Sequence, residues 1–472
     1  MGPLRRRLDA DVLIAGGGPA GASSALRLSQ YGHTVLLLDL LDRGEGKRQH
    51  VGESLPSSIR VVLATLGVEL PPELVVKRPP SHLVYWGEMQ GGQTWADVPE
   101  RESSLLVWRG PFDRFLREEA IAKGVRLVPD AVSGVSRSKG VIEVRTVQGA
   151  ELRGRFFIDA TGRSGVLARS YRRKESRFRT LALTGYFRTE ETEPPTIVEA
   201  FEDGWIWTAP LANGLRDVTV MLEASEPGSD RNALFASALG RARNVSSRVS
   251  GACLSGPLRG IDATPYEASR FCGSDFLLVG DAASFLDPLS AHGVHKAMDG
   301  ALVAAVSTHT ILERPERAGD AADFYNQRES NIYRITTERL RALYRQETRF
   351  SARPFWRNRS EGPGVDGERP APRPPLAKNA ALTSSRAVAV AEAPVVEGDF
   401  IERREVLVAP GQERPVRFLG PVCLPDLYKD VVSSGSALEA ARRSPFGIER
   451  ALAAVDWLYR EGYLEPRDST EL

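Results

Sequence analysis

Cysteine is scarce in this sequence, and long apolar runs are missing. The 472 residues include three cysteines, Cys253, Cys272 and Cys423, which lie far apart and form no CxxC pair. This spacing does not suggest a metal site, and we expect reduced thiols that are mostly buried. No apolar run approaches the roughly 18 residues of a membrane-spanning helix, so we expect no membrane span. The apolar run after Arg5–Arg7 is too short for a secretion signal, which makes the cytoplasm the expected compartment.

A strong net charge is also missing. The 62 basic and 61 acidic residues leave a formal charge of +1, which gives no reason to expect nucleic acid or a strongly anionic surface as a partner. Internal repeats are not evident. A chain of this length can bury a large core and has room for two or three domains.

A glycine-rich turn near the start of the chain predicts a dinucleotide site. The motif GGGPAG at Gly16–Gly21 follows a buried strand expected at residues 11–15 and precedes a helix expected at residues 22–30. A second strand is expected at residues 34–38 and ends at Asp39, where a ribose-binding carboxylate belongs. The residues predicted to hold the pyrophosphate are Gly16, Gly18 and Gly21.

A second strand-to-helix junction indicates that the nucleotide is FAD. The apolar run at residues 276–279 leads into GDAASFLDPLSAHGVHKAM at Gly280–Met298, which continues into an Ala-rich helix. Two such junctions, far apart in the sequence, are what a flavin domain split by an insertion needs. The expected fold is therefore α/β, with a Rossmann-like FAD-binding domain that an antiparallel-sheet substrate domain interrupts.

The segments between the two junctions alternate helix and strand patterns. A helix is expected at residues 111–123, followed by a small sheet. The strands of that sheet are expected at residues 125–128, 132–137, 141–147 and 151–158, before the sequence DATG at Asp159–Gly162. Residues 180–264 alternate short strands with turns, as in an antiparallel sheet that roofs a substrate pocket.

The C-terminal third differs in composition. Residues 320–349 have a charged helical pattern, and residues 360–394 are rich in Pro, Gly, Ala and Ser, which indicates a linker. Beyond it, a strand at residues 400–408 and helices at residues 436–443 and 447–461 predict a small helical or winged module. The expected divisions are an FAD-binding domain at 8–79, 106–179 and 270–350, a substrate domain at 80–105 and 180–269, a linker at 351–395 and the C-terminal module at 396–472.

These motifs together resemble the single-component FAD monooxygenase superfamily, and within it the branch that contains flavin-dependent halogenases. The shared motifs are GGGPAG, VGESL at Val51–Leu55, WRGPFDRFL at Trp108–Leu116, DATG, WIWTAP at Trp205–Pro210 and GDAASFLDP at Gly280–Pro288. Their order is more specific than any one of them. The resemblance implies an FAD-dependent oxidoreductase of the monooxygenase type, with O2 as co-substrate and NAD(P)H or a separate flavin reductase as the electron source.

The resemblance also implies which residues contact FAD. The implied cofactor-binding residues are Gly16, Gly18, Ala20, Gly21, Asp39, Arg48, Arg109, Asp159, Gly162, Asp281, Pro288, Gly293 and Val294. Arg109 and Asp281 are implied to contact the phosphate and ribityl region, with a surface ion pair and a helix cap as the structural alternatives. The segment Pro288–Val294 is implied to pass beside the isoalloxazine ring, where backbone N–H groups stabilise negative charge.

Halogenation and hydroxylation need different side chains. In the halogenases of this branch a lysine carries the oxidised halide, and the corresponding position here is His82, unless a shifted alignment gives that role to Lys77. Ser290 stands where tryptophan halogenases have a glutamate, and Ala209 stands where they prefer isoleucine. Oxygen insertion by a flavin C4a-hydroperoxide into an electron-rich ring needs no lysine, so the sequence favours hydroxylation.

Four polar residues are candidates for catalysis. His292 and His295 flank the flavin-side segment, where an imidazole can shuttle protons near neutral pH, and packing on the following helix is the alternative for His295. His82 is a candidate base on the substrate side, with a structural polar role as its alternative. Glu53 is implied to lie in a flavin-adjacent loop, with helix capping as its alternative.

The predicted substrate is an indole- or phenol-like ring. Trp205 and Trp207 alternate on an expected strand and so face the same side, where they stack an aromatic substrate or pack in the core. A tethered C-terminal module is unnecessary for a free small molecule, which suggests a tryptophan residue within a peptide or protein. The peptidyl tryptophan dihydroxylase of tryptophylquinone cofactor maturation belongs to the same branch. Flavin-dependent halogenation and a reductase of the geranylgeranyl-reductase type remain alternative activities. The C-terminal arginines are interleaved with acidic residues and do not form a convincing nucleic-acid surface.

Overall fold

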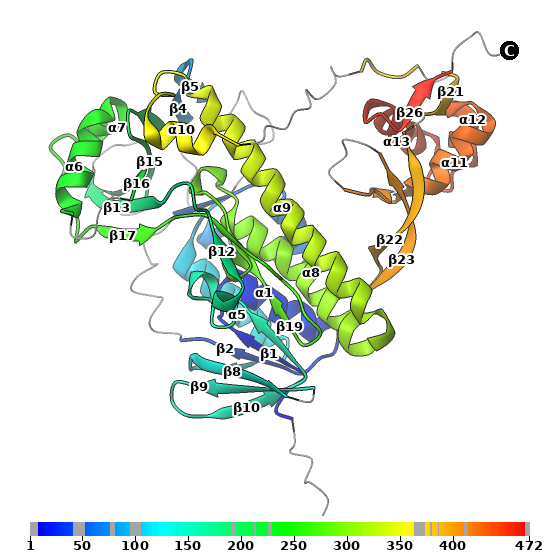
Figure 1. Ribbon diagram of the computed structural model, residues 1–472, viewed down its shortest axis with the longest axis horizontal. Helices are drawn as coiled ribbons and strands as arrows, with labels where there is room; N and C mark the ends of the chain where they lie inside the picture. Colours follow the sequence, from blue (N-terminus) through cyan, green and yellow to red (C-terminus); the bar gives the residue numbers. More distant parts are fainter. Residues whose placement is uncertain are drawn as a thin grey trace, which may run out of the picture. The chain divides into compact units, whose positions relative to one another are not determined.

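The protein has a mixed α/β fold, as predicted. The computed structural model describes residues 8–40, 52–75, 81–94, 105–138, 140–189, 195–211, 214–224, 229–362, 373–377, 380–385, 387–409 and 414–467. The chain forms two compact units, the first made of Met1–Ala318 and Tyr325–Gly364 and the second of Gly319–Phe324 and Val365–Leu472 (Figure 1).

A five-stranded parallel sheet is the core of the nucleotide-binding half of the first unit. Its strand order is β19-β11-β1-β2-β7, and each neighbouring pair is parallel. The strands are β1 (Val12–Ala15), β2 (Val35–Leu38), β7 (Arg126–Val128), β11 (Phe156–Asp159) and β19 (Phe276–Leu278). The runs VLIA, VLLL and FFID are buried throughout, as expected of strands that are covered on both faces.

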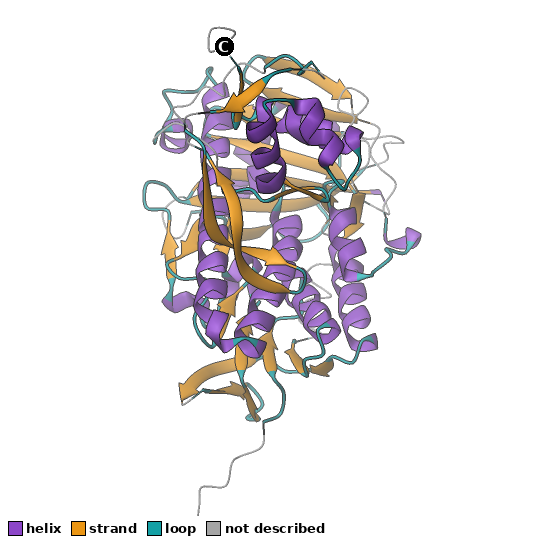
Figure 2. Ribbon diagram, turned by 90° about the vertical axis from the view of Figure 1, so that its right-hand side faces the viewer, coloured by secondary structure: helices purple, strands orange, loops and turns teal. Residues whose placement is uncertain are grey.

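Helices with small side chains cover this sheet. α1 (Pro19–Gln30) packs against α5 (Arg109–Ala122) and α8 (Gly293–Glu313), and the shorter α3 (Ile59–Leu66) contacts α1 and α8. Alanines at the buried positions of α1 and α8 let the two helices approach closely. Figure 2 shows the helices of this layer running roughly side by side.

One predicted strand is in fact two. Residues 151–158 were expected to be a single strand, but the chain changes partners after β10 (Glu151–Gly154) and continues as β11. β10 pairs antiparallel with β9 (Val141–Thr146), which pairs with β8 (Val132–Ser138), whereas β11 pairs parallel with β1. The break lies at Arg155, whose backbone N–H donates to the Asp11 carbonyl oxygen over 2.9 Å. An apolar run alone does not show such a change of sheet.

The second large sheet of the first unit has seven strands in the order β17-β13-β16-β15-β14-β4-β5. The strands are β4 (Ser81–Trp86), β5 (Met89–Thr94), β13 (Thr180–Arg188), β14 (Thr196–Phe201), β15 (Gly204–Pro210), β16 (Leu215–Glu223) and β17 (Arg259–Asp262). The expected antiparallel sheet is therefore present, although β4 and β14 pair in parallel. Its outer face packs on α6 (Arg231–Arg241) and α7 (Arg243–Arg248) through an apolar cluster that includes Val218 and Phe235.

The inner face of this sheet packs on the end of the long helix α9 (Ala318–Gln346) and on α10 (Pro354–Ser360). Trp356 of α10 is fully buried there, between the ring of Trp86 at 4.9 Å and that of Phe355 at 5.4 Å. The prediction of a linker from residue 351 is therefore wrong at this end, because the Phe-Trp pair places α10 in the core. Figure 1 shows α9 running beside α8 toward this sheet.

The second unit has its own apolar core. It contains β21 (Leu382–Ser384), β22 (Ala389–Glu397), β23 (Phe400–Val408), β24 (Phe418–Leu419), β25 (Val422–Cys423), β26 (Leu464–Pro466), α11 (Leu424–Ser434), α12 (Ala437–Arg443) and α13 (Ile448–Arg460). The predicted linker is also wrong at its C-terminal end, because residues 389–397 form a two-stranded ribbon with β23. Pro394 is tolerated because a ribbon has a free edge. Helix α11 was not predicted.

Several short elements complete the first unit. They are β3 (Gly52–Leu55), β6 (Leu105–Trp108), β12 (Arg172–Lys174), β18 (Tyr266–Ala268), β20 (Ser284–Phe285) and the 3₁₀ turns at Pro72–Leu74, Gly162–Ser164, Ala168–Ser170, Gly280–Ala282, Pro288–Ser290 and Pro315–Arg317. Of the cysteines, Cys272 is buried, Cys423 is half-buried and Cys253 is exposed. No helix in the described part of the chain is long and apolar enough to cross a membrane.

Candidate active site

The turn between β1 and α1 is shaped so that only glycine fits. Gly16 has φ of +96°, and a Cβ there would lie 2.4 Å from the Ala160 carbonyl oxygen. A Cβ on Gly21 would lie 1.8 Å from the Gly16 carbonyl oxygen. Gly18 precedes the first turn of α1, and among the described residues no side chain caps its N–H groups. Together with the positive end of the helix dipole, these N–H groups suit a phosphate.

Asp39 lies at the same turn, as predicted. It follows β2 directly, and its Oδ2 lies 3.5 Å from Nη1 of Arg117. The same guanidinium donates to the Gly17 carbonyl oxygen over 3.2 Å, so Arg117 joins the turn to the acidic residue. Sequence reasoning missed Arg117, because nothing in WRGPFDRFLREEA distinguishes it from its neighbour Arg114.

A cluster of charged groups lies where β3, α5 and the turn after β19 meet. Arg109 Nε and Nη2 donate to the Asp113 carboxylate over 3.0 and 3.1 Å, and Nη1 lies 3.4 Å from Glu53 Oε2. Burial raises the pKa of Glu53, which Arg109 opposes and the nearby Asp113 and Asp281 reinforce. Glu53, Arg109 and Asp281, predicted separately from three motifs, are thus close enough to interact electrostatically.

Lys296 of α8 holds the turn that follows β19 through hydrogen bonds to its backbone. Its buried ammonium donates to the Ser284 carbonyl oxygen over 2.6 Å, to Ser284 Oγ over 2.9 Å and to the Gly280 carbonyl oxygen over 3.2 Å. Burial lowers the pKa of Lys296, while Asp281 raises it. A Cβ on Gly280 would lie 2.9 Å from Cβ of Ala20, so the two predicted turns touch. Sequence reasoning missed Lys296, whose burial depends on tertiary packing.

The carboxylate of the DATG segment makes several hydrogen bonds within the protein. Asp159 is fully buried, and its carboxylate accepts bonds from Thr161 N and Oγ1, Leu167 N and Ala168 N over 2.6–3.0 Å. These bonds hold the loop beside Gly16, where Gly162 turns with φ of +62°. The cofactor contact implied for Asp159 and Gly162 stays a prediction.

The flavin-side segment begins with a 3₁₀ turn at Pro288–Ser290 and enters α8 at Gly293. Ala291 between them has φ of +50° and is the one non-glycine residue with a positive φ in the described ranges. Such a conformation costs free energy and is retained where the surrounding structure enforces it. Val294 is buried in the first turn of α8, and the flavin contacts of this segment stay a prediction.

The two predicted histidines occupy different environments. His292 is exposed, and its Nδ1 contacts the Ser290 carbonyl oxygen. His295 is half-buried on α8, where its Nε2 lies 2.9 Å from Ser58 Oγ, and burial lowers its pKa. The two rings lie 6.5 Å apart. His295 therefore has the partner expected of a packing residue, and His292 is the one that faces solvent.

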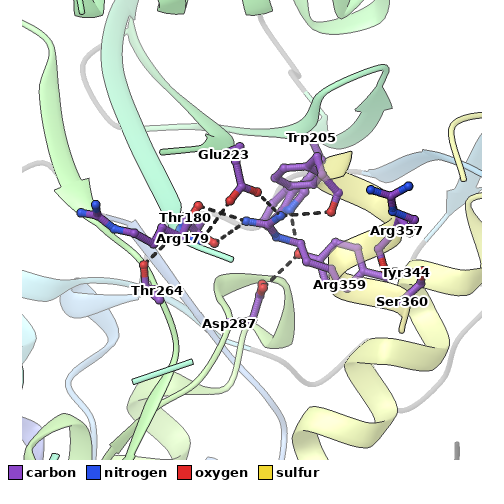
Figure 3. Close-up of polar contacts among 11 residues, drawn as sticks. Arg179, Thr180, Trp205, Glu223, Thr264, Asp287, Tyr344, Arg357, Arg359 and Ser360 are labelled. Atoms are coloured by element: carbon purple, nitrogen blue, oxygen red, sulfur yellow. Dashed lines mark hydrogen bonds and ion pairs between the residues drawn. The ribbon is translucent and has the colours of Figure 1, made fainter. Parts of the chain in front are cut away.

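A polar network ties the flavin-side segment to the seven-stranded sheet (Figure 3). Trp205 Nε1 donates to the Tyr344 hydroxyl over 3.1 Å, and that hydroxyl donates to Asp287 Oδ2 over 3.0 Å. Oδ1 of Asp287 caps the 3₁₀ turn by accepting from Leu289 N over 3.0 Å. Beside this row, the buried Arg359 donates to Glu223 and to Thr180, each over 2.7 Å.

The predicted substrate-side residues all lie on β4 and β15. Trp205 is buried in the cluster with Trp86, and Trp207 is partly exposed on the same face, as the strand alternation predicted. His82 is partly buried on β4, two residues before Val84 of the same cluster. The other two predicted positions, Arg48 and Lys77, lie outside the described residues.

The tryptophan halogenase family model matches residues 102–369, more than half of the chain. The chain belongs to the tryptophan halogenase family. Within this family, a tryptophan 2-halogenase from Chondromyces crocatus is 27% identical over 347 residues, which are 67% of this chain and 64% of that protein. The flavin-dependent halogenase armH1 from Armillaria mellea is 26% identical over 370 residues, 69% of each protein.

Two solved structures match nearly the whole chain. The peptidyl tryptophan dihydroxylase QhpG, essential for tryptophylquinone cofactor biogenesis, is 27% identical, with a TM-score of 0.73 over 96% of this chain and 99% of QhpG. The flavin-dependent halogenase CmlS has a TM-score of 0.78 over 98% of this chain and 96% of CmlS, but at 23% identity it shows the fold alone. The family match and these relatives show that the chain is an FAD-dependent oxidoreductase of the halogenase-like branch.

The geometry fits FAD. The backbone around Gly16 and Gly21 leaves no room for side chains, and the uncapped start of α1 offers N–H groups to a pyrophosphate. Asp39 follows β2 at the position of a ribose-binding carboxylate. Arg109, held between two carboxylates, presents a fixed positive charge near Asp281.

Proposed function

We propose that this enzyme is an FAD-dependent monooxygenase that hydroxylates the indole ring of a tryptophan residue within a peptide or protein. The observation that carries the proposal is the 27% identity to QhpG, a peptidyl tryptophan dihydroxylase, over almost the full length of both proteins. The similarity to QhpG includes the second unit, but so does the match to the halogenase CmlS, so the second unit alone does not separate hydroxylation from halogenation. O2 is the proposed co-substrate, and NAD(P)H or a separate flavin reductase is the proposed electron donor.

In this proposal the first unit holds both cofactor and substrate. The turn at Gly16–Gly21 would bind the FAD pyrophosphate, Asp39 the adenosine ribose, and Arg109 the phosphate and ribityl region. Reduced FAD supplies the electrons that activate O2. The backbone of Pro288–Val294 would lie beside the ring system, and Asp287 keeps that segment in place through the bond to Leu289.

The chain's own residues would orient the substrate ring and exclude water. Trp207 on the inner face of the seven-stranded sheet offers an aromatic surface for stacking. His292 is the proposed proton shuttle at the solvent side, and the lowered pKa keeps His295 neutral and able to accept a proton near pH 7. His82 remains a proposed base on the substrate side.

Halogenation is the second candidate, and the names of the sequence relatives favour it. A halogenase of this branch needs a lysine that reaches the substrate. Among the described lysines, Lys123 ends α5, Lys174 pairs with Asp262, Lys429 lies in the second unit and Lys296 is committed to backbone oxygens. None of these lies on the strand that carries His82. Lys77, which lies outside the described residues, is the lysine that we propose a halogenase would use.

The two candidates differ in the atom added to the ring. We would incubate the FAD-loaded protein with a flavin reductase, NADH, sodium bromide, oxygen-18 gas and a panel of tryptophan-containing peptides, and analyse products by mass spectrometry. Hydroxylation predicts incorporation of oxygen-18 that Lys77→Ala does not change. Bromide incorporation abolished by Lys77→Ala would establish the halogenase. Peptides that gain neither atom while O2 is consumed would contradict both candidates.

A further inference from the structure

Three rows of side chains cross the inner face of the seven-stranded sheet. Strand register defines them, because residues paired across neighbouring strands lie on the same face. The first row contains Trp86, Ala200, Trp205, Met221 and Ala182, and the aromatic cluster of α9 and α10 covers it. The second row, two residues further along each strand, contains Val84, Val198, Trp207, Thr219 and Thr184. Asp217 and Tyr186 lie in the third row.

The second row is a partly exposed strip between buried neighbours. All five of its members are partly exposed, whereas the first row and Asp217 and Tyr186 of the third row are buried. Phe285 of β20 and Leu289 of the flavin-side segment pack against the same cluster as Val84, Val198 and Trp207. The strip is thus an apolar and aromatic surface close to the proposed flavin position, with two hydroxyl groups at one end.

Those hydroxyls form a chain that ends at a buried carboxylate. Thr184 Oγ1 and Thr219 Oγ1 lie 2.8 Å apart, and Thr219 Oγ1 donates to Asp217 Oδ1 over 2.8 Å. A threonine has one hydroxyl proton, and Thr219 donates its proton to the ionised carboxylate. Thr184 must then be the donor to Thr219. The oxygen of Thr184, at the partly exposed end, is left with lone pairs and can only accept.

The environment of Asp217 makes it able to change protonation state near neutral pH. Asp217 is 3% exposed, and burial raises its pKa to about 7, although the hydrogen bond from Thr219 acts to lower it. The groups that face it are Tyr186 on β13, close enough to feel its charge, and Arg259 on β17, which lies over the Tyr186 ring at 5.8 Å. The hydrogen bond from Thr219 Oγ1 connects this carboxylate to the second row.

We propose that Thr184, Thr219 and Asp217 form a relay that binds the ring N–H of an indole substrate and accepts its proton. The Thr184 oxygen contacts the substrate, while Thr219 and Asp217 act through it as positioning residues. If the proton leaves the ring nitrogen, Thr184 takes it and passes its own proton to Thr219, which passes its proton to Asp217. Each threonine oxygen keeps its number of bonds, the Asp217 carboxylate gains the proton that the ring nitrogen loses, and the negative charge moves from the carboxylate to the substrate.

An indole suits this strip because its single polar atom is a donor and the rest of its surface is apolar. Trp207 and Val198 offer the surface for the ring, and Thr184 offers the acceptor at its edge. This inference rests on the proposed function, since it assumes that the strip holds the ring to be oxidised. It assigns the polar recognition to residues that none of the sequence motifs contains.

Binding measured without turnover tests the relay. N-acetyl-L-tryptophanamide and its 1-methyl analogue, which lacks the N–H, would be titrated into FAD-loaded protein under nitrogen, with the flavin absorbance as the signal. We expect the wild type to bind the N–H probe about tenfold more tightly than the methylated one. Thr184→Val and Asp217→Asn should reduce this preference to less than about twofold. Thr146→Val, which removes another hydroxyl bonded to a buried aspartate, Asp130, should leave it unchanged.

The pH dependence separates a relay from a structural role. The preference for the N–H probe should fall as the pH drops below about 7, because protonated Asp217 frees the hydroxyl protons to point the other way. In Asp217→Asn the residual preference should not change with pH. Equal binding of both probes by the wild type, or an undiminished preference in Thr184→Val, would overturn the relay. An intact N–H preference without oxygen-18 in any product would instead contradict the proposed function alone.

Discussion

Replacing Asp217 by asparagine should stabilise the protein at high pH. Burial raises the folded-state pKa of this carboxyl from 3.8 to about 7. A raised pKa means that the contribution of the group to stability is complete below the unfolded-state value and is lost as the pH rises through the folded-state value. At about 1.4 kcal/mol per pH unit, the wild type loses roughly 3 kcal/mol between pH 5 and pH 8 that the Asp217→Asn variant keeps.

Thermal unfolding of the apoprotein, followed by circular dichroism at pH 5 and pH 8, measures this difference. The unfolding midpoint of Asp217→Asn should rise relative to that of the wild type by roughly 4 °C on going from pH 5 to pH 8. Asp130→Asn is the matched control, because hydrogen bonds from the Thr146 side chain and two backbone N–H groups lower the pKa of Asp130. The Asp130 carboxyl is ionised in the folded and in the unfolded protein over this pH range. The unfolding midpoint of Asp130→Asn should therefore differ from that of the wild type by the same amount at both pH values. Midpoints of Asp217→Asn and wild type that move in parallel would refute the assignment.

Three further substitutions test the cofactor turns and the polar network. Gly21→Ala should yield protein without the flavin absorbance near 450 nm, since its Cβ would lie 1.8 Å from a carbonyl oxygen, whereas Gly240→Ala, with open space around it, should keep the flavin. Lys296→Met should weaken FAD binding about tenfold or more in equilibrium dialysis, because two backbone oxygens lose a charged donor; unchanged affinity would contradict its role. Tyr344→Phe should lower the free energy of unfolding by about 2 kcal/mol, through loss of two hydrogen bonds, and should exceed the loss for Tyr325→Phe, whose hydroxyl makes one.

The features that the sequence predicted correctly are those encoded by neighbouring residues. Gly16–Gly21 and Gly280 each show their turn through local composition, and both turns are where they were expected. Arg117, Lys296 and Thr184 could not be selected, because each acquires its partners from segments far away in the chain. Their residue types are common on ordinary helix and strand surfaces, so the signal exists only in three dimensions.

Composition was least reliable at the predicted linker. The proline, glycine and alanine between residues 351 and 395 led to the prediction of a linker. The structure instead has the buried Phe355-Trp356 pair in this range and a two-stranded ribbon that includes residues 389–397. Two consecutive aromatic residues next to a proline at the start of a helix were the available sign of α10. The catalytic assignments of His82, His292 and Glu53 remain predictions, because they depend on where the substrate ring binds.

The Asp287 carboxylate holds two parts of the molecule with its two oxygens. One oxygen fixes the turn that begins the flavin-side segment, and the other accepts from Tyr344, which carries the indole of Trp205 on the substrate-side sheet. If the proposed function holds, these hydrogen bonds, rather than the closure of a loop, would set the distance between the flavin and the substrate surface. In such an arrangement, the orientation of the substrate ring on the seven-stranded sheet decides which carbon atom is attacked. Substitutions on the inner face of that sheet should therefore change the regioselectivity more than substitutions in the flavin-side segment.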